Sequence, residues 1–471
     1  MTGLAQRRGA CPALSAPMQT GDGLLVRLNP VAAGLPTAAL IGLCESAARH
    51  GNGIMEITQR GSIQIRGLTS ESASLLADDV NALGISVRTG VPVETSPLAG
   101  IDPDETADPH PLAEAIRTAV ESAGLPRRLG PKISVVVDGG GRIGMGALLA
   151  DIRLTAVRRE QETYWHLAVG GTADTARPVG LFAKADAVAT TLETLEAIAA
   201  LGREGRGRNI VAGHTPTPNP SPQGGGESHD SQAAPDGRND GADLSPSPLL
   251  GGVARLPPLD SASPLGTVLL ANATHALGIA LPFGSMPAET LAALARAAAD
   301  LGATEIRAAP GRMLLLLSLT AEAAATLQAK AAALDFVTDA ADPRLFIAAC
   351  PGAPACTSAH MGTRPLAGQI AQQDADLLDG SFTLHVSGCA KGCAHPGTAA
   401  LTLVGGENGA GLVVNGTAKT LPAGYASRYD AARGIGRLAA LVDTGRRPDE
   451  TAAACLARLG AAAIATDFAE G

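Results

Sequence analysis

The chain has 471 residues, a formal net charge of −9 at pH 7, and a composition that is 45% hydrophobic and only 2% aromatic. This length allows about three domains, whose cores must be built mainly from Ala, Leu, Val and Ile. The negative charge argues against nucleic acid as the main partner, and no run of about 18 apolar residues predicts a membrane span. We therefore expect a soluble, cytoplasmic protein. An anionic small ligand remains compatible, because local arginine clusters can override the global charge.

The first part of the chain predicts a compact α+β unit. Residues 23–29 have the composition of a strand, and apolar residues recur at helical spacing from 37 to 50. Ile63 and Ile65 alternate with polar residues, which is the pattern of a half-buried strand. A second helical segment, 70–83, closes the unit. Strand, helix, strand and helix within about 65 residues are typical of an α+β half-domain.

The region that follows contains a glycine-rich motif between predicted strands. Strand patterns occupy 133–137, 154–157 and 162–171, and a helix is predicted at 185–201. Gly139–Gly144 match the pattern G-x-G-x-x-G, which alone is a weak signal for dinucleotide binding. A dinucleotide fold requires a helix directly after the motif, whereas a strand follows here. We therefore expect a hairpin turn at this position.

A stretch rich in Pro, Gly and Ser divides the chain after about residue 204. It contains Thr-Pro-Thr-Pro-Asn-Pro-Ser-Pro and almost no periodic apolar residues. Such a composition cannot bury enough apolar surface to offset the entropy of ordering. We interpret residues 204–260 as a disordered linker without chemistry of its own.

After this stretch the order of elements of the first unit returns. Residues 278–282 predict a strand, 288–301 a helix, and 304–320 a turn followed by a strand. Two short matches relate the repeats: Glu56–Ile57 with Glu305–Ile306, and Gly67–Thr69 with Ser318–Thr320. The offset of about 250 residues is too long for a solenoid and indicates an internal duplication. We expect the two halves to face each other across a pseudo-twofold axis, with a ligand site between them.

Four of the seven cysteines form two close pairs near the C-terminus. Cys350 and Cys356 have the spacing C-x5-C, and Cys389 and Cys393 have the spacing C-x3-C. Four thiolates on two loops are what a [4Fe–4S] cluster requires. Zinc is an alternative, but its pairs usually have the tighter spacing C-x2–4-C. Disulfides are a second alternative, and no secretory signal supports them. The remaining three cysteines are interpreted as ordinary buried thiols: Cys11, Cys44 and Cys455.

Three segments resemble the sulfite/nitrite reductase superfamily: Arg8–Arg27, Thr58–Gly67 with the pattern T-x-R-x3-Q, and Leu384–Pro396. Within the superfamily the chain is similar to the precorrin-3B synthase family. The run Gly-Cys-Ala-Lys-Gly-Cys-Ala-His-Pro carries this resemblance, because sulfite and nitrite reductases usually differ between and after the two cysteines. One departure concerns a basic run in which reductases have two active-site lysines. Leu125–Lys132 contains only Lys132, which argues against direct sulfite or nitrite reduction.

The resemblance implies a duplicated α+β architecture of the sulfite/nitrite reductase type. It contains two ferredoxin-like half-domains and two α+β domains that hold the tetrapyrrole and the iron–sulfur cluster. The implied boundaries are 17–85 for the first ferredoxin-like half-domain, 86–203 for the first α+β domain, 204–260 for the linker, 261–340 for the second half-domain and 341–471 for the cluster domain.

The family consists of oxygen-dependent monooxygenases of aerobic cobalamin biosynthesis. The resemblance implies conversion of precorrin-3A to precorrin-3B by hydroxylation at C20 with γ-lactone formation. It also implies a [4Fe–4S] cluster, a mononuclear non-haem iron, O2 as co-substrate, and NADH or NADPH as electron source, directly or through a separate reductase. A sirohaem-dependent assimilatory sulfite or nitrite reductase is the alternative. A non-enzymatic iron–sulfur carrier fits poorly with the size of the chain and its arginine-rich halves.

The resemblance also implies the site residues. The four paired cysteines, Cys350, Cys356, Cys389 and Cys393, would hold the cluster, with Cys393 facing the substrate and Lys391 tempering the cluster charge. A carboxylate-rimmed tetrapyrrole requires guanidinium groups that pair with its carboxylates. We assign its binding to Arg27, Arg60, Gln64, Arg66, Arg127, Arg128, Lys132, Arg307 and Arg312. No catalytic residue, no ligand of a mononuclear iron, no electron donor, no oligomeric state, and no role for His385 or His395 follows from the sequence.

Overall fold

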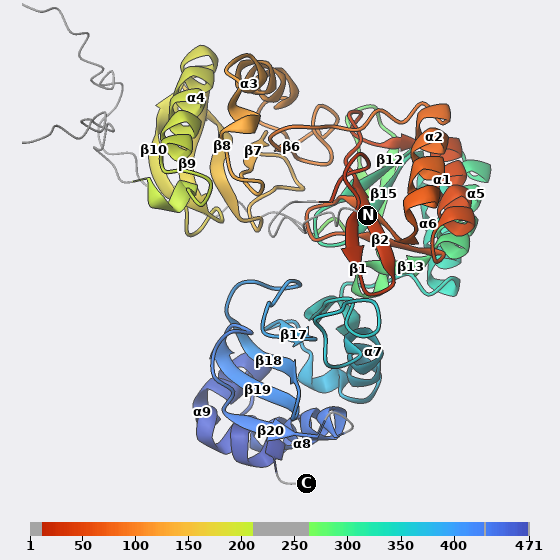
Figure 1. The fold of residues 1–471 in the computed structure, drawn as a ribbon, viewed down its shortest axis with the longest axis vertical. Coiled ribbons are helices and arrows are strands. Elements are labelled where there is room, and N and C mark those ends of the chain that lie inside the picture. Colours follow the sequence, from red (N-terminus) through yellow and green to blue (C-terminus); the bar gives the residue numbers. More distant parts are fainter. Residues whose placement is uncertain (1–11, 211–262, 428–429, 470–471) are drawn as a thin grey trace, which may run out of the picture. The chain divides into compact units, whose positions relative to one another are not determined.

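The computed structural model describes residues 12–210, 263–427 and 430–469. They form two compact units, each described here by itself (Figure 1). The larger unit holds the described residues of 1–89, 101–104 and 261–471, and the smaller those of 90–100 and 105–260. The larger unit thus combines both predicted half-domains with the cysteine-bearing domain.

The predicted linker begins later than its composition suggests. Residues 204–210 are described, and the N–H of Gly207 donates to Oδ1 of Asp151 at 2.9 Å. This buried hydrogen bond keeps the chain packed on the smaller unit up to that point. The rest of the predicted linker lies outside the described residues, as does Cys11.

The first half-domain is an antiparallel sheet covered by helices on one face (Figure 1). Both predicted strands and both predicted helices are present. Its strands, in sheet order, are β1 (Met18–Thr20), β2 (Gly23–Leu28), β5 (Ile63–Leu68), β4 (Ile54–Ile57) and β13 (Ser285–Pro287), and its helices are α1 (Thr37–His50) and α2 (Ser70–Ala82). Val26, Ile63 and Ile65 point into the core, so the alternating polar residues lie on the opposite face.

The second half-domain repeats this arrangement. Its strands, in sheet order, are β11 (Gly266–Leu269), β12 (His275–Ala280), β15 (Met313–Leu319), β14 (Glu305–Ala309) and β3 (Leu35–Pro36), and its helices are α5 (Ala288–Asp300) and α6 (Ala321–Ala333). Thr69 and Thr320 cap α2 and α6 in the same way, each accepting a backbone N–H three residues ahead. Apolar residues of both halves belong to a single core.

The two half-domains exchange edge strands. β13 follows the second half in sequence but pairs with β4, where Ser285 lies opposite Glu56. Reciprocally, β3 belongs to the first half in sequence but pairs with β14, where Leu35 lies opposite Ile306. Each exchanged strand leads directly into α5 or α1. This reciprocity is that of a pseudo-twofold axis, and the predicted duplication is confirmed.

The ladder register corrects one part of the predicted alignment. Each exchanged strand ends in a proline, which lies opposite Ile54 in the first half and Glu305 in the second. Ile54 is therefore equivalent to Glu305, and Glu56 to Arg307. The predicted alignment of Glu56 with Glu305 is therefore wrong by two residues. Both strands contain the dipeptide Glu-Ile, but at positions that differ by two residues along the strand.

The cysteine-bearing domain contains one mixed sheet. Its strands, in order, are β16 (Ile347–Ala349), β17 (Leu384–Ser387), β18 (Ala399–Gly406), β19 (Gly409–Gly416) and β20 (Gly424–Ala426), and its helices are α7 (Thr363–Gln373), α8 (Ala431–Gly445) and α9 (Ala452–Ala469). The first three strands run parallel, β19 runs antiparallel to β18, and β20 runs antiparallel to β19.

The smaller unit has a sheet with the same strand order and directions. Its strands are β6 (Val93–Thr95), β7 (Val135–Asp138), β8 (Ala150–Arg159), β9 (Glu162–Gly171) and β10 (Arg177–Phe182), and its helices are α3 (His110–Ser122) and α4 (Lys184–Ala200). β6, β7 and β8 are parallel, β9 is antiparallel to β8, and β10 is antiparallel to β9. The two α+β domains are therefore also duplicates. Short 3₁₀ helices complete the fold at Leu125–Arg127, Gly207–Asn209, Pro282–Gly284, Pro343–Phe346 and Ala375–Leu377.

The expected hairpin at Gly139–Gly144 is wrong. β7 and β8 are parallel neighbours, so the glycine-rich segment is part of a crossover loop and no helix follows it. Asp138 holds the loop by accepting the N–H of Gly140 at 3.0 Å and that of Met145 at 2.6 Å. Local patterns predict strands but not their relative directions, which is why the turn type was missed.

Helix α9 is the one helix of the described residues that is long and apolar enough to span a membrane by length and composition. Arg458 and Asp467 interrupt its apolar stretch. Gly460, at φ 81° and ψ 157°, divides it into two helical pieces. Ile464 and Phe468 are buried in the core of the cysteine-bearing domain, so one face of the helix packs within the protein.

Candidate functional site

The two cysteine pairs lie at one edge of the cysteine-bearing sheet. Cys350 directly follows β16, and Cys389 comes two residues after β17. These strands are parallel neighbours, with Ala349 opposite Val386. Because the carboxyl ends of parallel strands meet at the same edge, both loops emerge side by side.

Direct contacts join the two loops. The N–H of Gly388 donates to Sγ of Cys350 at 3.2 Å, and the N–H of His360 donates to the Gly388 carbonyl at 2.8 Å. Nζ of Lys391 donates to Oγ of Ser358 at 2.6 Å. Lys391 thus binds the first loop through its side chain, which fixes its charge beside the cysteines.

These loops carry the four cysteines that are the candidate ligands of an iron–sulfur cluster. Among the described residues, none of the four cysteines is in a disulfide. Three are half-buried and Cys393 is exposed. A backbone N–H directed at a cysteine sulfur is the kind of contact that stabilises a ligating thiolate. The described residues contain no group of three or more His, Cys, Asp and Glu suited to a single metal ion.

Gly388 is required for the approach of the two loops. A Cβ at this position would lie 2.6 Å from Cβ of Ala359 on the other loop. Gly388→Ala should therefore push the loops apart, at a cost of about 1–3 kcal/mol, and lower the iron content of the purified protein. Gly362→Ala is the matched control, because its nearest neighbour would be 3.6 Å away. Equal iron content and thermal stability in the two variants would contradict the proposed contact.

A row of polar side chains crosses the face of the first sheet that is turned away from its helices. The register sets Arg27 beside Gln64, and Gln64 beside Glu56, on three adjacent strands. Nε and Nη2 of Arg27 donate to Oε1 of Gln64 at 3.0 and 2.6 Å. Nε2 of Gln64 donates in turn to Glu56 at 2.7 Å. Gln64 therefore orients Arg27, and its own amide orientation is fixed by Glu56.

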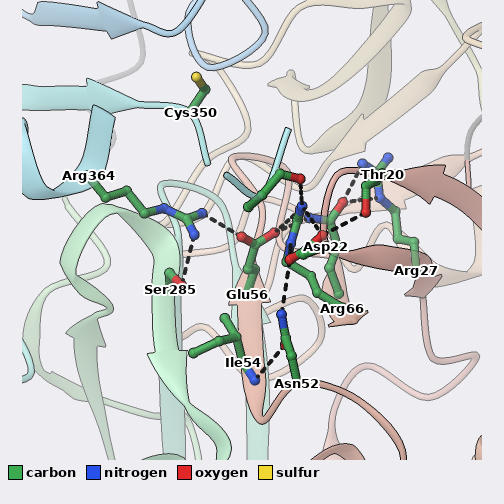
Figure 2. Close-up of polar contacts among 12 residues, drawn as sticks. Thr20, Asp22, Arg27, Asn52, Ile54, Glu56, Arg66, Ser285, Cys350 and Arg364 are labelled. Carbon is green, nitrogen blue, oxygen red and sulfur yellow. Dashed lines mark hydrogen bonds and ion pairs between the residues drawn. The ribbon is translucent and has the colours of Figure 1, made fainter. Parts of the chain in front are cut away.

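Glu56 is a buried carboxylate between two arginines. It is 3% exposed, and Nη2 of Arg364 on α7 donates to it at 2.6 Å. Arg66 approaches it from the other side at 3.5 Å (Figure 2). Nη1 of Arg364 also donates to Ser285 of the exchanged strand β13 at 3.0 Å. Two guanidinium groups thus offset the cost of burying this charge.

Arg66 is itself buried, with 4% of its side chain exposed. Its Nε and Nη2 donate to the two carboxylate oxygens of Asp22 at 3.0 and 2.9 Å. Nη2 also donates to the carbonyl of Ala355 at 2.7 Å. Burial lowers the pKa of Arg66, but Asp22 and Glu56 outweigh burial and raise it above its ordinary value. These N–H groups of Arg66 therefore all donate to other groups of the protein.

The Asp22–Arg66 pair predicts a pH dependence of stability. Partial burial raises the pKa of Asp22, but the hydrogen bonds and charge of Arg66 outweigh it and hold the pKa below its ordinary value of 3.8. Such a carboxyl stabilises the folded state above its unfolded pKa and loses this contribution as the pH falls through its folded pKa. Asp22→Asn should therefore be less stable than the wild type near pH 7, and the gap should close below about pH 4. Urea unfolding at a series of pH values measures this, and a gap independent of pH would rule it out.

Arg60 and Arg312 come from two turns that bind each other. Arg60 lies in the turn between β4 and β5, Arg312 in the equivalent turn between β14 and β15. The N–H of Gly311 donates to the carbonyl of Gln59 at 3.1 Å, which joins the turns. Burial, with a contribution from the charge of Arg364, lowers the pKa of Arg312 to about 10. Its Nη2 reaches the carbonyl of Ala394, next to Cys393, at 3.4 Å.

The other predicted binding residues lie on other elements. Arg307 lies within β14 rather than in the turn, and its Nε donates to Glu305 at 2.8 Å. Arg127, Arg128 and Lys132 are exposed residues of the smaller unit, where Arg128 pairs with Glu196 at 2.6 Å.

His385 is a buried histidine beneath the second cysteine loop. It is fully buried on β17, and neither ring nitrogen has a hydrogen-bond partner. Its ring centre lies 5.7 Å from that of His395. Burial, with smaller contributions from the charges of His395 and Arg312, lowers the pKa of His385 to about 4. The ring is therefore neutral at pH 7.

Sequence reasoning missed Asp22, Glu56 and Arg364 as members of this site. Glu56 offered one signal, because a carboxylate within an otherwise apolar strand needs a buried partner. Arg364 offered none, since it is 308 positions from Glu56 in sequence.

Comparisons with known proteins agree with this geometry. The nitrite/sulfite reductase ferredoxin-like half domain matches residues 16–83, and the nitrite and sulphite reductase 4Fe-4S domain matches 88–208. A precorrin-3B synthase of Sinorhizobium sp is 41% identical over 467 residues, which cover 99% of this chain and 96% of the relative. The chain belongs to the precorrin-3B synthase family. The family resemblance found in the sequence is confirmed.

Two more distant proteins are also similar to this chain. A ferredoxin–nitrite reductase of Synechococcus elongatus is 25% identical over 407 residues, covering 81% of this chain and 76% of its own. The structure of Mycobacterium tuberculosis NirA protein has a TM-score of 0.66 at 18% identity, and the match covers 94% of this chain and 84% of that one. This likeness supports the fold, and the expected duplicated α+β class is confirmed.

The 4Fe-4S domain match supports an iron–sulfur cluster in this protein but falls on residues without cysteine. Residues 88–208 include most of the smaller unit and contain no cysteine. In the shared sheet topology, the position of Cys350 after β16 is taken by Ser96 after β6. The position of Cys389, two residues after β17, is taken by Gly140 after β7. Of the two duplicated domains, only the C-terminal one has the thiols for a cluster.

Proposed function

We propose that this protein converts precorrin-3A to precorrin-3B, by hydroxylation at C20 with γ-lactone formation. The observation that carries the proposal is the 41% identity to a precorrin-3B synthase along nearly the whole of both chains. For the alternative, a sirohaem-dependent reductase, the curated relative reported above is only 25% identical. The single lysine in Leu125–Lys132 also argues against it.

The substrate carboxylates would be bound by guanidinium groups of the larger unit. Arg27 is half-buried and oriented by Gln64, and Arg60 and Arg312 lie on the two joined turns. Planar guanidinium groups pair with carboxylates through two parallel hydrogen bonds, which supplies both charge and orientation. Four of the remaining assigned residues stay in the proposal with less support: Arg127, Arg128, Lys132 and Arg307. Arg66 is left out of it, because its donors bind Asp22 and Ala355.

Cys350, Cys356, Cys389 and Cys393 are the proposed ligands of the cluster. When bound, a [4Fe–4S] cluster supplies single electrons. The protein's own contribution would be to orient these thiolates, with Gly388 N–H donating to Cys350 and Lys391 fixed beside them. Cys393 is the exposed member and therefore the one nearest to a ligand that arrives from solvent.

A monooxygenase reaction needs a source of electrons. One atom of O2 enters the substrate and the other leaves as water, which consumes two electrons and two protons. We propose NADH or NADPH as the source, directly or through a separate reductase. The described residues offer no set of ligands that fits a mononuclear iron, so no step is assigned to one. The proposed location is the cytoplasm.

Anaerobic purification tests the proposal. The protein should carry iron and sulfide, should lack sirohaem absorbance, and should form precorrin-3B from precorrin-3A only when O2 and a reductant are present. Purified protein that carries sirohaem and reduces sulfite or nitrite would overturn the assignment in favour of the alternative.

A further inference from the structure

We propose that Arg66 is a positioning residue that fixes the loop of Cys356, and that it holds this cysteine for the cluster rather than binding the substrate. The inference rests on the proposed function in that Cys356 is taken as a cluster ligand.

The geometry of Arg66 is fixed by its partners. Asp22 binds it through two parallel hydrogen bonds, and Glu56 lies on its other side (Figure 2). With 4% of the side chain exposed, the guanidinium plane cannot turn toward solvent without breaking a buried ion pair. Its remaining donor capacity is therefore directed at one place.

That place is the carbonyl directly before Cys356. Ala355 accepts from Nη2 of Arg66 at 2.7 Å and from the N–H of Gly21 at 3.1 Å. A carbonyl has two lone pairs, so the first half-domain satisfies both. A Cβ on Gly21 would lie 2.4 Å from the carbonyl of Pro354, which shows how closely the β1–β2 turn approaches the cysteine loop.

The same network anchors the other end of the loop. Thr363, the first residue of α7, donates its hydroxyl to the carbonyl of Cys350. The next residue, Arg364, is bound to Glu56 at 2.6 Å. The loop from Cys350 to Thr363 is thus fastened to one buried group of charges on the first sheet at Ala355, within the loop, and at Arg364, directly after it.

The internal duplication provides a comparison within the same chain. The backbone contact is repeated, since the N–H of Ala271 donates to the carbonyl of Ile101 at 3.0 Å as Gly21 does to Ala355. The charges are not repeated. By the ladder register, Leu317 is the residue equivalent to Arg66. The turn 270–274, which corresponds to the turn that carries Asp22, contains no acidic residue. The loop around Ile101 also contains no cysteine.

The arginine and its carboxylate are therefore present where a cysteine must be placed and absent where none is needed. A rigid cluster requires each sulfur to be held within about half an ångström, and the dipoles around the sulfurs set its reduction potential. An arginine with five donors can bind Asp22 and Ala355 at once, whereas a lysine at this position could not keep the planar fork.

Arg66→Gln and Arg66→Lys test the proposal, with Gly21→Ala as an independent disturbance of the same contact. Arg49→Gln is the control, because Arg49 forms an exposed ion pair with Asp79 on the same half-domain. Backbone hydrogen exchange in residues 353–358, the rate of iron loss to a chelator under argon, and the midpoint potential would be measured on each purified protein.

In Arg66→Gln we expect the rates of backbone hydrogen exchange in residues 353–358 and of iron loss to rise about tenfold. In Arg66→Lys both rates should rise less, and the midpoint potential of the cluster should be shifted in both variants. Exchange in α1 should stay at the wild-type level in both variants and in the control.

If Arg66→Gln does not fold, Gly21→Ala and Arg66→Lys should still show the local effect. Wild-type exchange and iron loss in all three variants would overturn the proposal, as would weaker binding of precorrin-3A as the sole effect. Failure of the wild type to form precorrin-3B would instead contradict the proposed function, because loop exchange is measured without substrate.

Discussion

Replacing Cys389 or Cys393 by Ser should remove the broad visible absorbance of the cluster and the formation of precorrin-3B together. A serine oxygen is a poor substitute for a thiolate ligand, and [4Fe–4S] clusters are held by four cysteines. Both residues lie on the loop after β17, which binds the Cys350 loop through Gly388. Iron and sulfide assays after anaerobic purification, with a visible spectrum, measure the loss.

Cys44→Ala is the control for this experiment. Cys44 is 1% exposed in the core of the half-domains, and burial raises the pKa of its thiol to about 12. It is therefore not a thiolate and should not bind iron. Full iron and sulfide content in both Cys389→Ser and Cys393→Ser would contradict the assignment of four ligands. Iron loss in Cys44→Ala as well would show that the assay reports general instability.

Arg60→Ala and Arg312→Ala should each weaken the binding of precorrin-3A by about ten- to a hundredfold. Hydrogen bonds to charged groups contribute roughly 1.5–3 kcal/mol, and 1.4 kcal/mol corresponds to a factor of ten. The two turns that carry these residues are joined through Gly311 and Gln59, so both arginines can act on one ligand. Arg307, by contrast, lies within β14 and is bound to Glu305.

Titration with precorrin-3A under argon measures this effect. Arg296→Ala is the control, since Arg296 forms an exposed pair with Glu45 on the helix-covered side. The cluster spectrum should be unchanged in all three variants, because no residue replaced is a proposed ligand. Wild-type affinity in Arg60→Ala and Arg312→Ala would refute substrate binding by the joined turns. Loss of a bound sirohaem in these variants would support the reductase alternative.

Local pattern was sufficient for most elements of the half-domains. The helical spacing at 37–50 and 288–301 corresponds to α1 and α5 within a residue. The exchanged strands could not be predicted, because β3 and β13 are two and three residues long and carry no alternation. Their pairing depends on contacts between segments about 250 residues apart, which no local rule detects.

The candidate site could likewise be predicted from the sequence only in part. Spacing alone identified the two cysteine pairs, and alternation in β5 indicated that Gln64 and Arg66 share a polar face. What these residues bind depended on tertiary structure. Arg66 was predicted to bind substrate because an arginine in a superfamily motif suggests a ligand, yet its donors reach Asp22 and Ala355. Neither partner is near Arg66 in sequence.

The exchange of β3 and β13 has a consequence for the order in which the protein can form during translation. When the ribosome has released the first half-domain, β4 still lacks its neighbour, because Ser285–Pro287 has not yet been synthesised. The nascent sheet therefore has an open edge while the long stretch of chain between the first half-domain and Ser285 is made. Open edges pair readily with other strands. A chain that stops before Ser285 should aggregate, whereas a chain that includes β13 can close its first sheet on itself.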